Sequence, residues 1–106
     1  MSSFALNYVM NLLSRREYSE FELRCKMQEK AFSEEDIDQA IAHCQQKNWQ
    51  SDQRFTESYL NSRSQRGYGI NRIKQELRQL KGIDSATIEA VVRECDIDWL
   101  ALALKV

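Results

Sequence analysis

The chain has 106 residues, 42% of them hydrophobic, and a formal net charge of −1, so its length allows one ordinary domain or two very small ones. The near-neutral total predicts no gross attraction to nucleic acid. The sequence has no run of eighteen apolar residues that would span a membrane, and its N-terminus lacks the regions of a signal peptide. Three widely separated cysteines fit a reducing compartment, and we therefore expect a cytoplasmic protein.

The spacing of the apolar residues predicts helices throughout the chain and no strands. Ser19 and Glu22 form a capping-box pattern before the second helix, and Ser33 and Asp84 are placed to cap the third and the sixth. The three glycines lie at predicted joints, where a positive φ angle is often needed. The predicted helices cover residues 3–14, 20–30, 34–47, 52–66, 70–81 and 85–95, and a seventh begins near residue 97.

The sequence also repeats itself at a spacing of about fifty residues, which is typical of one supersecondary unit used again. Arg16 and Tyr18 match Arg66 and Tyr68 at a spacing of 50 residues. Ile41 matches Val92 at a spacing of 51. We therefore predict an all-α fold of tandem three-helix repeats. The first repeat covers 1–50, the second 51–95, and 96–106 begin an incomplete third. Apolar residues at 70, 73, 77 and 80 are predicted to form the inward face of the fifth helix.

Charge is segregated along the chain, although the total is near zero. Residues 54–81 hold seven Lys or Arg against two Glu, which predicts a basic face on the second repeat. The equivalent face of the first repeat interleaves its cations with four glutamates and ranks lower. The candidate partner-binding residues are Arg63, Arg66, Tyr68, Arg72, Lys74, Arg78 and Lys81 in the second repeat, and Arg15, Arg16, Arg24 and Lys26 in the first.

Two alternatives stand beside this interpretation. The basic residues of a helix often form nothing more than a solvated face. Tyr18 and Tyr68, which precede equivalent helices, are most simply staples that pack back onto those helices, although Tyr68 between two glycines could present its ring to a partner.

No residue pattern predicts catalysis, a metal site or a cofactor. The only histidine is His43, no CxxC pair exists, and no P-loop or nucleophile elbow is present. Cys44 and Cys95 are expected to be small core residues, whereas Cys25 lies on a polar stretch. We therefore predict a protein that is not an enzyme and has no small-molecule substrate.

Three stretches closely resemble the RecX family of bacterial regulators of the recombinase RecA. They are LLSRREYSEFELRCKM, SDQRFTESYLNSRSQRGYGINRIKQELRQLKGI and RECDIDW. The resemblance implies an elongated, curved array of three-helix modules. It further implies a role in DNA repair, homologous recombination and the SOS response, by binding the RecA–DNA filament and restraining filament growth, ATP hydrolysis and strand exchange. Members usually carry a third module, of which this chain has only the start.

Two other functions stay open from the residues alone. Three-helix units with a basic helix are a common DNA-binding architecture, so a protein that binds single- or double-stranded DNA without sequence preference is one alternative. A passive helical adaptor for another protein is the other.

Overall fold

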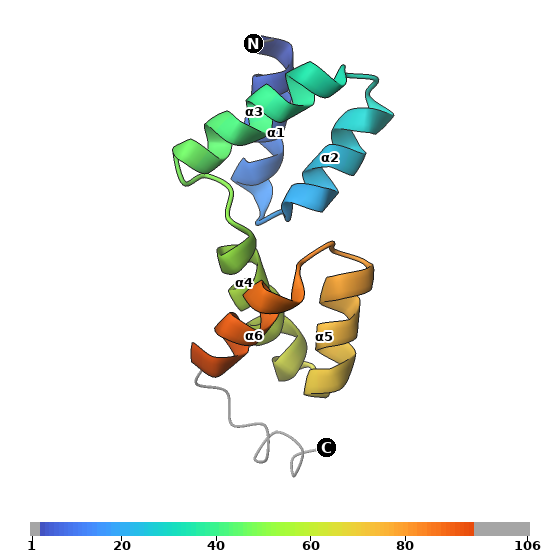
Figure 1. The fold of residues 1–106 in the computed structure, drawn as a ribbon, viewed down its shortest axis with the longest axis vertical. Helices are drawn as coiled ribbons and strands as arrows, with labels where there is room; N and C mark the ends of the chain where they lie inside the picture. Colours follow the sequence, from blue (N-terminus) through green and yellow to red (C-terminus); the bar gives the residue numbers. More distant parts are fainter. Residues whose placement is uncertain (1–2, 95–106) are drawn as a thin grey trace. The chain divides into compact units, whose positions relative to one another are not determined.

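A computed structural model describes residues 3–94, which form six helices and contain no strand. They divide into two compact units, and the boundary along the chain falls between Asp52 and Gln53, at the start of the fourth helix (Figure 1). The all-α prediction is confirmed, with each helix within two residues of its expected bounds. Unit 1 holds α1 (Ser3–Arg15), α2 (Glu20–Glu29) and α3 (Glu34–Gln46), and unit 2 holds α4 (Asp52–Gln65), α5 (Ile70–Gln79) and α6 (Ser85–Glu94). The predicted seventh helix, the incomplete third repeat and Cys95 lie outside the described residues.

The helix starts follow the predicted capping chemistry. The Ser19 hydroxyl accepts a hydrogen bond from the Glu22 backbone N–H at 3.1 Å, and the Glu22 carboxylate accepts one from the Ser19 N–H at 3.1 Å. Ser33 caps α3 by accepting from the Asp36 N–H. Asp84 accepts from the Thr87 N–H at 2.7 Å before α6, and the hydrogen bonds from the Thr87 hydroxyl and then from its N–H lower the pKa of the Asp84 carboxyl. Each cap satisfies N–H groups that the first turn of a helix leaves without partners.

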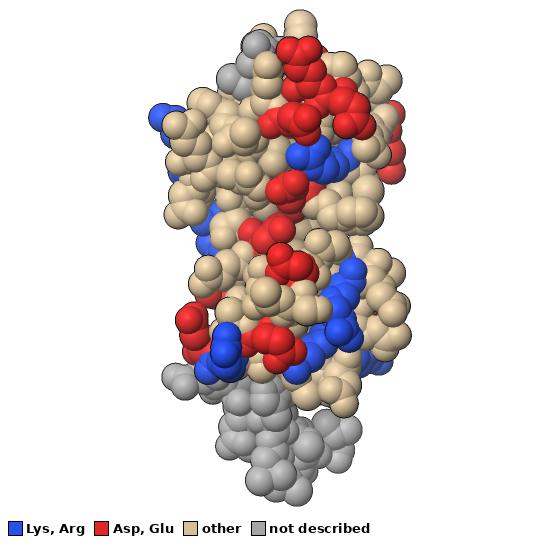
Figure 2. Space-filling view, viewed as in Figure 1, with Lys and Arg blue, Asp and Glu red and all other residues tan. Residues whose placement is uncertain are grey.

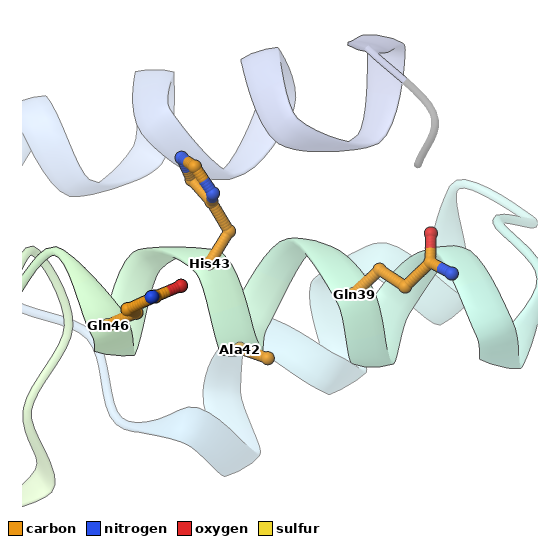
Figure 3. A pocket seen from close by; sticks show the side chains of 4 residues that line it. All are labelled: Gln39, Ala42, His43 and Gln46. Carbon is orange, nitrogen blue, oxygen red and sulfur yellow. The ribbon is translucent and has the colours of Figure 1, made fainter.

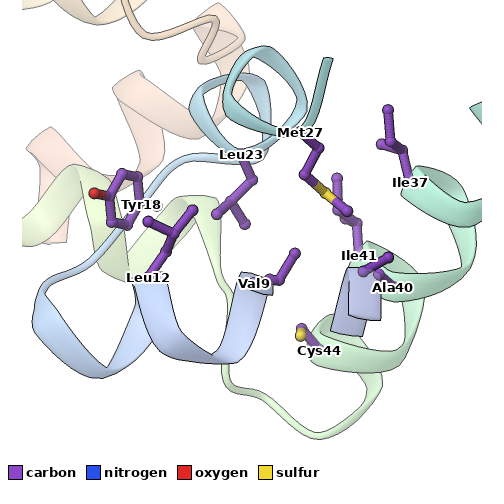
Figure 4. Close-up of a cluster of buried hydrophobic side chains, with 10 residues drawn as sticks. Val9, Leu12, Tyr18, Leu23, Met27, Ile37, Ala40, Ile41 and Cys44 are labelled. Atoms are coloured by element: carbon purple, nitrogen blue, oxygen red, sulfur yellow. The ribbon is translucent and has the colours of Figure 1, made fainter. Parts of the chain in front are cut away.

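The core of unit 1 lies where its three helices face one another (Figure 4). Leu23 and Met27 of α2 extend toward α1 and α3, and Tyr18 closes the end of the cluster near Leu12. The predicted burial of Cys44 is confirmed, and burial raises the pKa of its thiol. The buried residues are Ala5, Val9, Leu12, Tyr18, Leu23, Met27, Ile37, Ala40, Ile41 and Cys44.

The core of unit 2 repeats this plan but departs from the sequence prediction at two positions. Leu80 was expected to face inward and is instead 61% exposed, because α5 ends at Gln79 and Leu80 is its C-cap. Val91 and Val92 were both expected on the apolar stripe of the sixth helix; Val91 is buried, but Val92, the match of the buried Ile41, is only half-buried. The buried apolar residues are Phe55, Leu60, Ile73, Leu77, Ile83, Ile88 and Val91.

One turn shape ends the second helix of each unit. Ala31 and Gly82 have φ angles of 63° and 67°. The turn brings Phe32 and Ile83 back to the core, where their N–H groups donate to Met27 O and Leu77 O. Gly67 also has a positive φ, but Gly69, predicted to need one, has an extended backbone with φ of −71°.

Ala31 is therefore a strained position, because its Cβ is unfavourable at positive φ. Replacing Ala31 by glycine is expected to raise the free energy of unfolding by about 0.5–1 kcal/mol. The matched change is Ala42→Gly on the exposed face of α3, which should lower it by about 0.5–1 kcal/mol. Urea unfolding followed by circular dichroism measures both. A loss of stability in Ala31→Gly equal to that in Ala42→Gly would contradict the assignment of strain.

None of the helices within residues 3–94 is long and apolar enough to cross a membrane.

Candidate partner-binding surface

Equivalent ion pairs join the second helix to the third in both units. Arg24 of α2 donates to Asp38 of α3 at 2.6 Å, and Lys74 of α5 lies 3.0 Å from Glu89 of α6. The bond to Asp38 raises the pKa of the Arg24 guanidinium. Arg24 and Lys74 are two of the predicted partner-binding residues. The structure shows that both are already engaged inside their own units.

Three cations of unit 2 lie around α5 and just beyond the end of α4, and two of them carry no ion pair in the described part of the chain. Arg66 and Arg78 are exposed, and neither has an ion pair within residues 3–94. Lys81 is half-buried, with its ammonium 6.0 Å from the ring centre of Tyr59. In Figure 2 blue atoms form a band over α5 in unit 2, whereas red atoms gather where α3 begins in unit 1. Unit 2 therefore presents a basic face, as its sequence predicted.

Both tyrosines that precede a second helix pack inward and carry an arginine on the ring. Tyr18 is buried and Tyr68 is half-buried against the core of unit 2. The guanidinium carbon of Arg16 lies 3.7 Å from the ring centre of Tyr18, and that of Arg72 lies 4.0 Å from the ring centre of Tyr68. Such cation–π contacts hold a guanidinium in a fixed place.

Two residues of unit 2 that sequence reasoning did not single out organise this region. The Tyr59 hydroxyl donates to the Glu76 carboxylate at 2.6 Å, and Arg72 Nε lies 3.4 Å from the same carboxylate. The bond from Tyr59 lowers the pKa of Glu76, and burial followed by the same bond raises the pKa of Tyr59. Tyr59 and Arg63 are four residues apart on one helix, so their side chains are neighbours on its surface. This spacing is the signal in the sequence that could have pointed to Tyr59.

Arg63 lies between the two tyrosines of unit 2. Its guanidinium carbon is 4.7 Å from the ring centre of Tyr59 and 5.8 Å from that of Tyr68. Proximity to the Tyr59 hydroxyl raises the pKa of Arg63. Even so, its Nε atom is buried and has no hydrogen-bond partner in the described part of the chain.

The candidate face of unit 1 is more nearly neutralised. Arg16 pairs with Glu22 at 3.2 Å, and Arg24 pairs with Glu20 at 3.0 Å in addition to Asp38. Arg15 and Lys26 are exposed and have no ion pair within residues 3–94. Unit 1 thus offers fewer available cations than unit 2.

A shallow pocket elsewhere on unit 1 does not coincide with either basic set. Figure 3 shows its lining on α3, with His43 pointing toward the side where α1 runs. The ring centres of His43 and Trp49 are 5.7 Å apart in an edge-on arrangement, so part of the histidine is used in packing. The lining residues are Gln39, Ala42, His43 and Gln46, none of them a carboxylate or a cation with a fixed charge.

Comparison with known proteins matches both units. The family profile described as "RecX, first three-helix domain" matches residues 5–44, and that described as "RecX, second three-helix domain" matches 51–92. The "Regulatory protein RecX" of Mannheimia succiniciproducens is 67% identical over the whole chain, which covers 69% of that protein. The protein of the same name from Haemophilus influenzae is 68% identical over 97% of the chain, which covers 68% of it.

A solved structure supports the fold. The chain is similar to one described as "Crystal structure of regulatory protein RecX", with a TM-score of 0.79 and 22% identity over 87% of this chain. The chain spans 46% of the length of that solved chain. At this identity the likeness concerns the fold alone.

Two consecutive three-helix units with a basic face on the second define a tandem helical-repeat protein. Both family profiles match in order, and relatives about two-thirds identical are named regulatory proteins. The chain belongs to the RecX family.

Proposed function

We propose that the chain is a non-enzymatic modulator of RecA that binds the RecA–DNA filament and restrains its growth, ATP hydrolysis and strand exchange. The observation that carries the proposal is the basic face of unit 2, where Arg66 and Arg78 are exposed without an ion pair within residues 3–94. Family membership supports it, because the relatives are named regulatory proteins. The chain would act in the cytoplasm, in recombinational repair and the SOS response.

We expect the RecA filament to contact unit 2 before unit 1. Cations without an internal partner lose no existing ion pair when they meet an anionic group, whereas Arg24 and Lys74 would have to share theirs. Charge complementarity of this kind raises the association rate and sets the orientation of binding. Unit 1 then contributes Arg15 and Lys26 as a separate, weaker contact.

The direct test is ATP hydrolysis by RecA assembled on single-stranded DNA, measured while the chain is titrated in. We expect the hydrolysis rate to fall as the chain is added. The chain alone with ATP should hydrolyse none above background, as befits a protein that is not an enzyme. A RecA rate that stays constant at a saturating concentration of the chain would contradict the proposal.

A second candidate function is sequence-independent DNA binding, which the basic helix α5 favours. Binding dominated by phosphates weakens steeply with salt. The affinity of the chain for naked single-stranded DNA at several salt concentrations separates the two functions. If naked DNA binds as tightly as the filament, then DNA binding is the better description.

A further inference from the structure

The cluster of Tyr59, Arg63, Tyr68, Arg72 and Glu76 in unit 2 combines fixed cations with a shortage of acceptors. We call these five residues the tyrosine–arginine cluster. Arg63 contacts both tyrosine rings, and Arg72 lies over Tyr68 at 4.0 Å. The only carboxylate among them, Glu76, is taken up by Tyr59 at 2.6 Å and Arg72 at 3.4 Å. Arg63 therefore has no ion pair with a carboxylate within residues 3–94.

Arg63 is held between two rings, and one of its N–H groups lacks an acceptor within the described residues. Its Nε atom is buried and lacks a hydrogen-bond partner in the part of the chain that the structure describes. A guanidinium presents its N–H groups as a planar fork that matches a carboxylate with two parallel hydrogen bonds. The two rings already restrict this fork, so that little side-chain freedom remains to be lost when an anionic group arrives.

The three-helix fold does not need an arginine at this position. Counting back by about fifty residues from Arg63 leads to Leu12 or Leu13 in α1, and both belong to the apolar packing of unit 1. The residues around Tyr68 also differ from their counterparts in unit 1. Glu22 completes a capping box in unit 1, whereas Arg72, at the equivalent position in unit 2, lies over Tyr68. The cluster thus replaces residues that serve packing and capping in the other unit.

The composition of the cluster fits a protein partner better than a nucleic acid. Tyrosine and arginine are the residues that dominate the binding energy of protein interfaces. A nucleic-acid backbone needs a row of available cations, but along α5 Arg72 and Lys74 already face Glu76 and Glu89. The whole chain is also acidic by one charge. A single carboxylate matches the charge of the one guanidinium in the cluster that has no carboxylate partner within residues 3–94.

We infer that the tyrosine–arginine cluster is an anchor for a carboxylate side chain of the partner protein, received by Arg63 with Arg72 beside it. This inference rests on the proposed function, in which the partner is the RecA filament, and it names the protein component as the source of the anion. Glu76 is then an internal anion that lowers the positive potential of the anchor.

The test compares the affinity of the full chain for a RecA filament on single-stranded DNA with its affinity for the same DNA naked. Arg63→Leu is the central variant, because leucine occupies the corresponding place in unit 1. Its control is Arg93→Leu, which removes the same charge from an exposed position on α6. We expect Arg63→Leu to weaken filament binding at least tenfold and to leave naked DNA binding within twofold. Arg93→Leu should change neither by more than about twofold, since one exposed charge has little effect.

A second variant is expected to increase the affinity for the filament. A gain in affinity cannot be explained by a loss of folding. Glu76→Gln keeps an oxygen that accepts from Tyr59 but removes the internal negative charge. Filament binding should then tighten severalfold. A purely structural cluster would give weaker or unchanged binding.

Three outcomes overturn the inference. Filament binding by a folded Arg63→Leu variant that equals the parent shows that the cluster is no anchor, while the proposed function stands. An equal loss on filament and on naked DNA assigns the anion to phosphate. A parent chain that binds no filament overturns the proposed function and, with it, the inference.

Discussion

Replacing Leu77 by alanine is expected to lower the free energy of unfolding by about 2–5 kcal/mol. Leu77 is 0% exposed and belongs to the core that α5 forms with its neighbours in unit 2. A unit of about fifty residues has a total stability of roughly 2.5–7.5 kcal/mol. The variant should therefore lose a large share of the stability of unit 2, and urea unfolding followed by circular dichroism would show a clearly lower midpoint.

Leu80→Ala is the matched control, since it makes the same chemical change three residues further on. The periodicity of the sequence groups both leucines on one face, but Leu80 lies beyond the end of α5 and is 61% exposed. Its loss should change the free energy of unfolding by no more than about 0.5 kcal/mol. Equal losses at Leu77 and Leu80 would show that the inward face extends past Gln79 after all.

Reversing the charge of Arg66 and Arg78 to glutamate is expected to raise the concentration of chain needed for half-inhibition of RecA ATP hydrolysis at least tenfold. Neither side chain has an ion pair within residues 3–94, so the fold should keep its stability. Like charges placed at an interface cost several kcal/mol, and about 1.4 kcal/mol corresponds to a factor of ten in affinity. Lys74 is left unchanged, because its reversal would also oppose Glu89 inside the unit.

The matched control reverses Arg15 and Lys26 in unit 1. These side chains are also exposed and without an ion pair in the described chain, and the change in total charge is the same. Its effect should be the smaller of the two. A larger effect would move the binding surface to unit 1. Full inhibition by a well-folded Arg66/Arg78 variant would mean that the basic face is merely solvated.

Sequence reasoning succeeded where the physics is local. A capping box needs only Ser19 and Glu22 three residues apart, and both of its hydrogen bonds are present. Core positions within helices follow from a fixed angle per residue, which is why Ile73 and Leu77 are buried as expected. The same rule overreached at Leu80, because periodicity cannot tell where the last turn ends.

The candidate surface was harder to predict because it depends on contacts between helices. Arg24 and Lys74 looked available in the sequence, and only the packing of the second helix against the third shows their partners Asp38 and Glu89. Glu76 and Tyr59 are separated by seventeen residues and meet through tertiary structure. Their hydrogen bond could not follow from helical spacing, whereas the position of Arg63 beside Tyr59 follows from their four-residue spacing on α4.

The paired charges of the two units also bear on how such a chain can diversify. One copy uses arginine with aspartate and the other lysine with glutamate, yet the cation always sits on the second helix and the acid on the third. Each unit can therefore exchange arginine for lysine, or aspartate for glutamate, without losing the bridge. The two units share the order of the charges and not the residue types, so the bridge constrains the chemistry of these two positions less than their place on the helices.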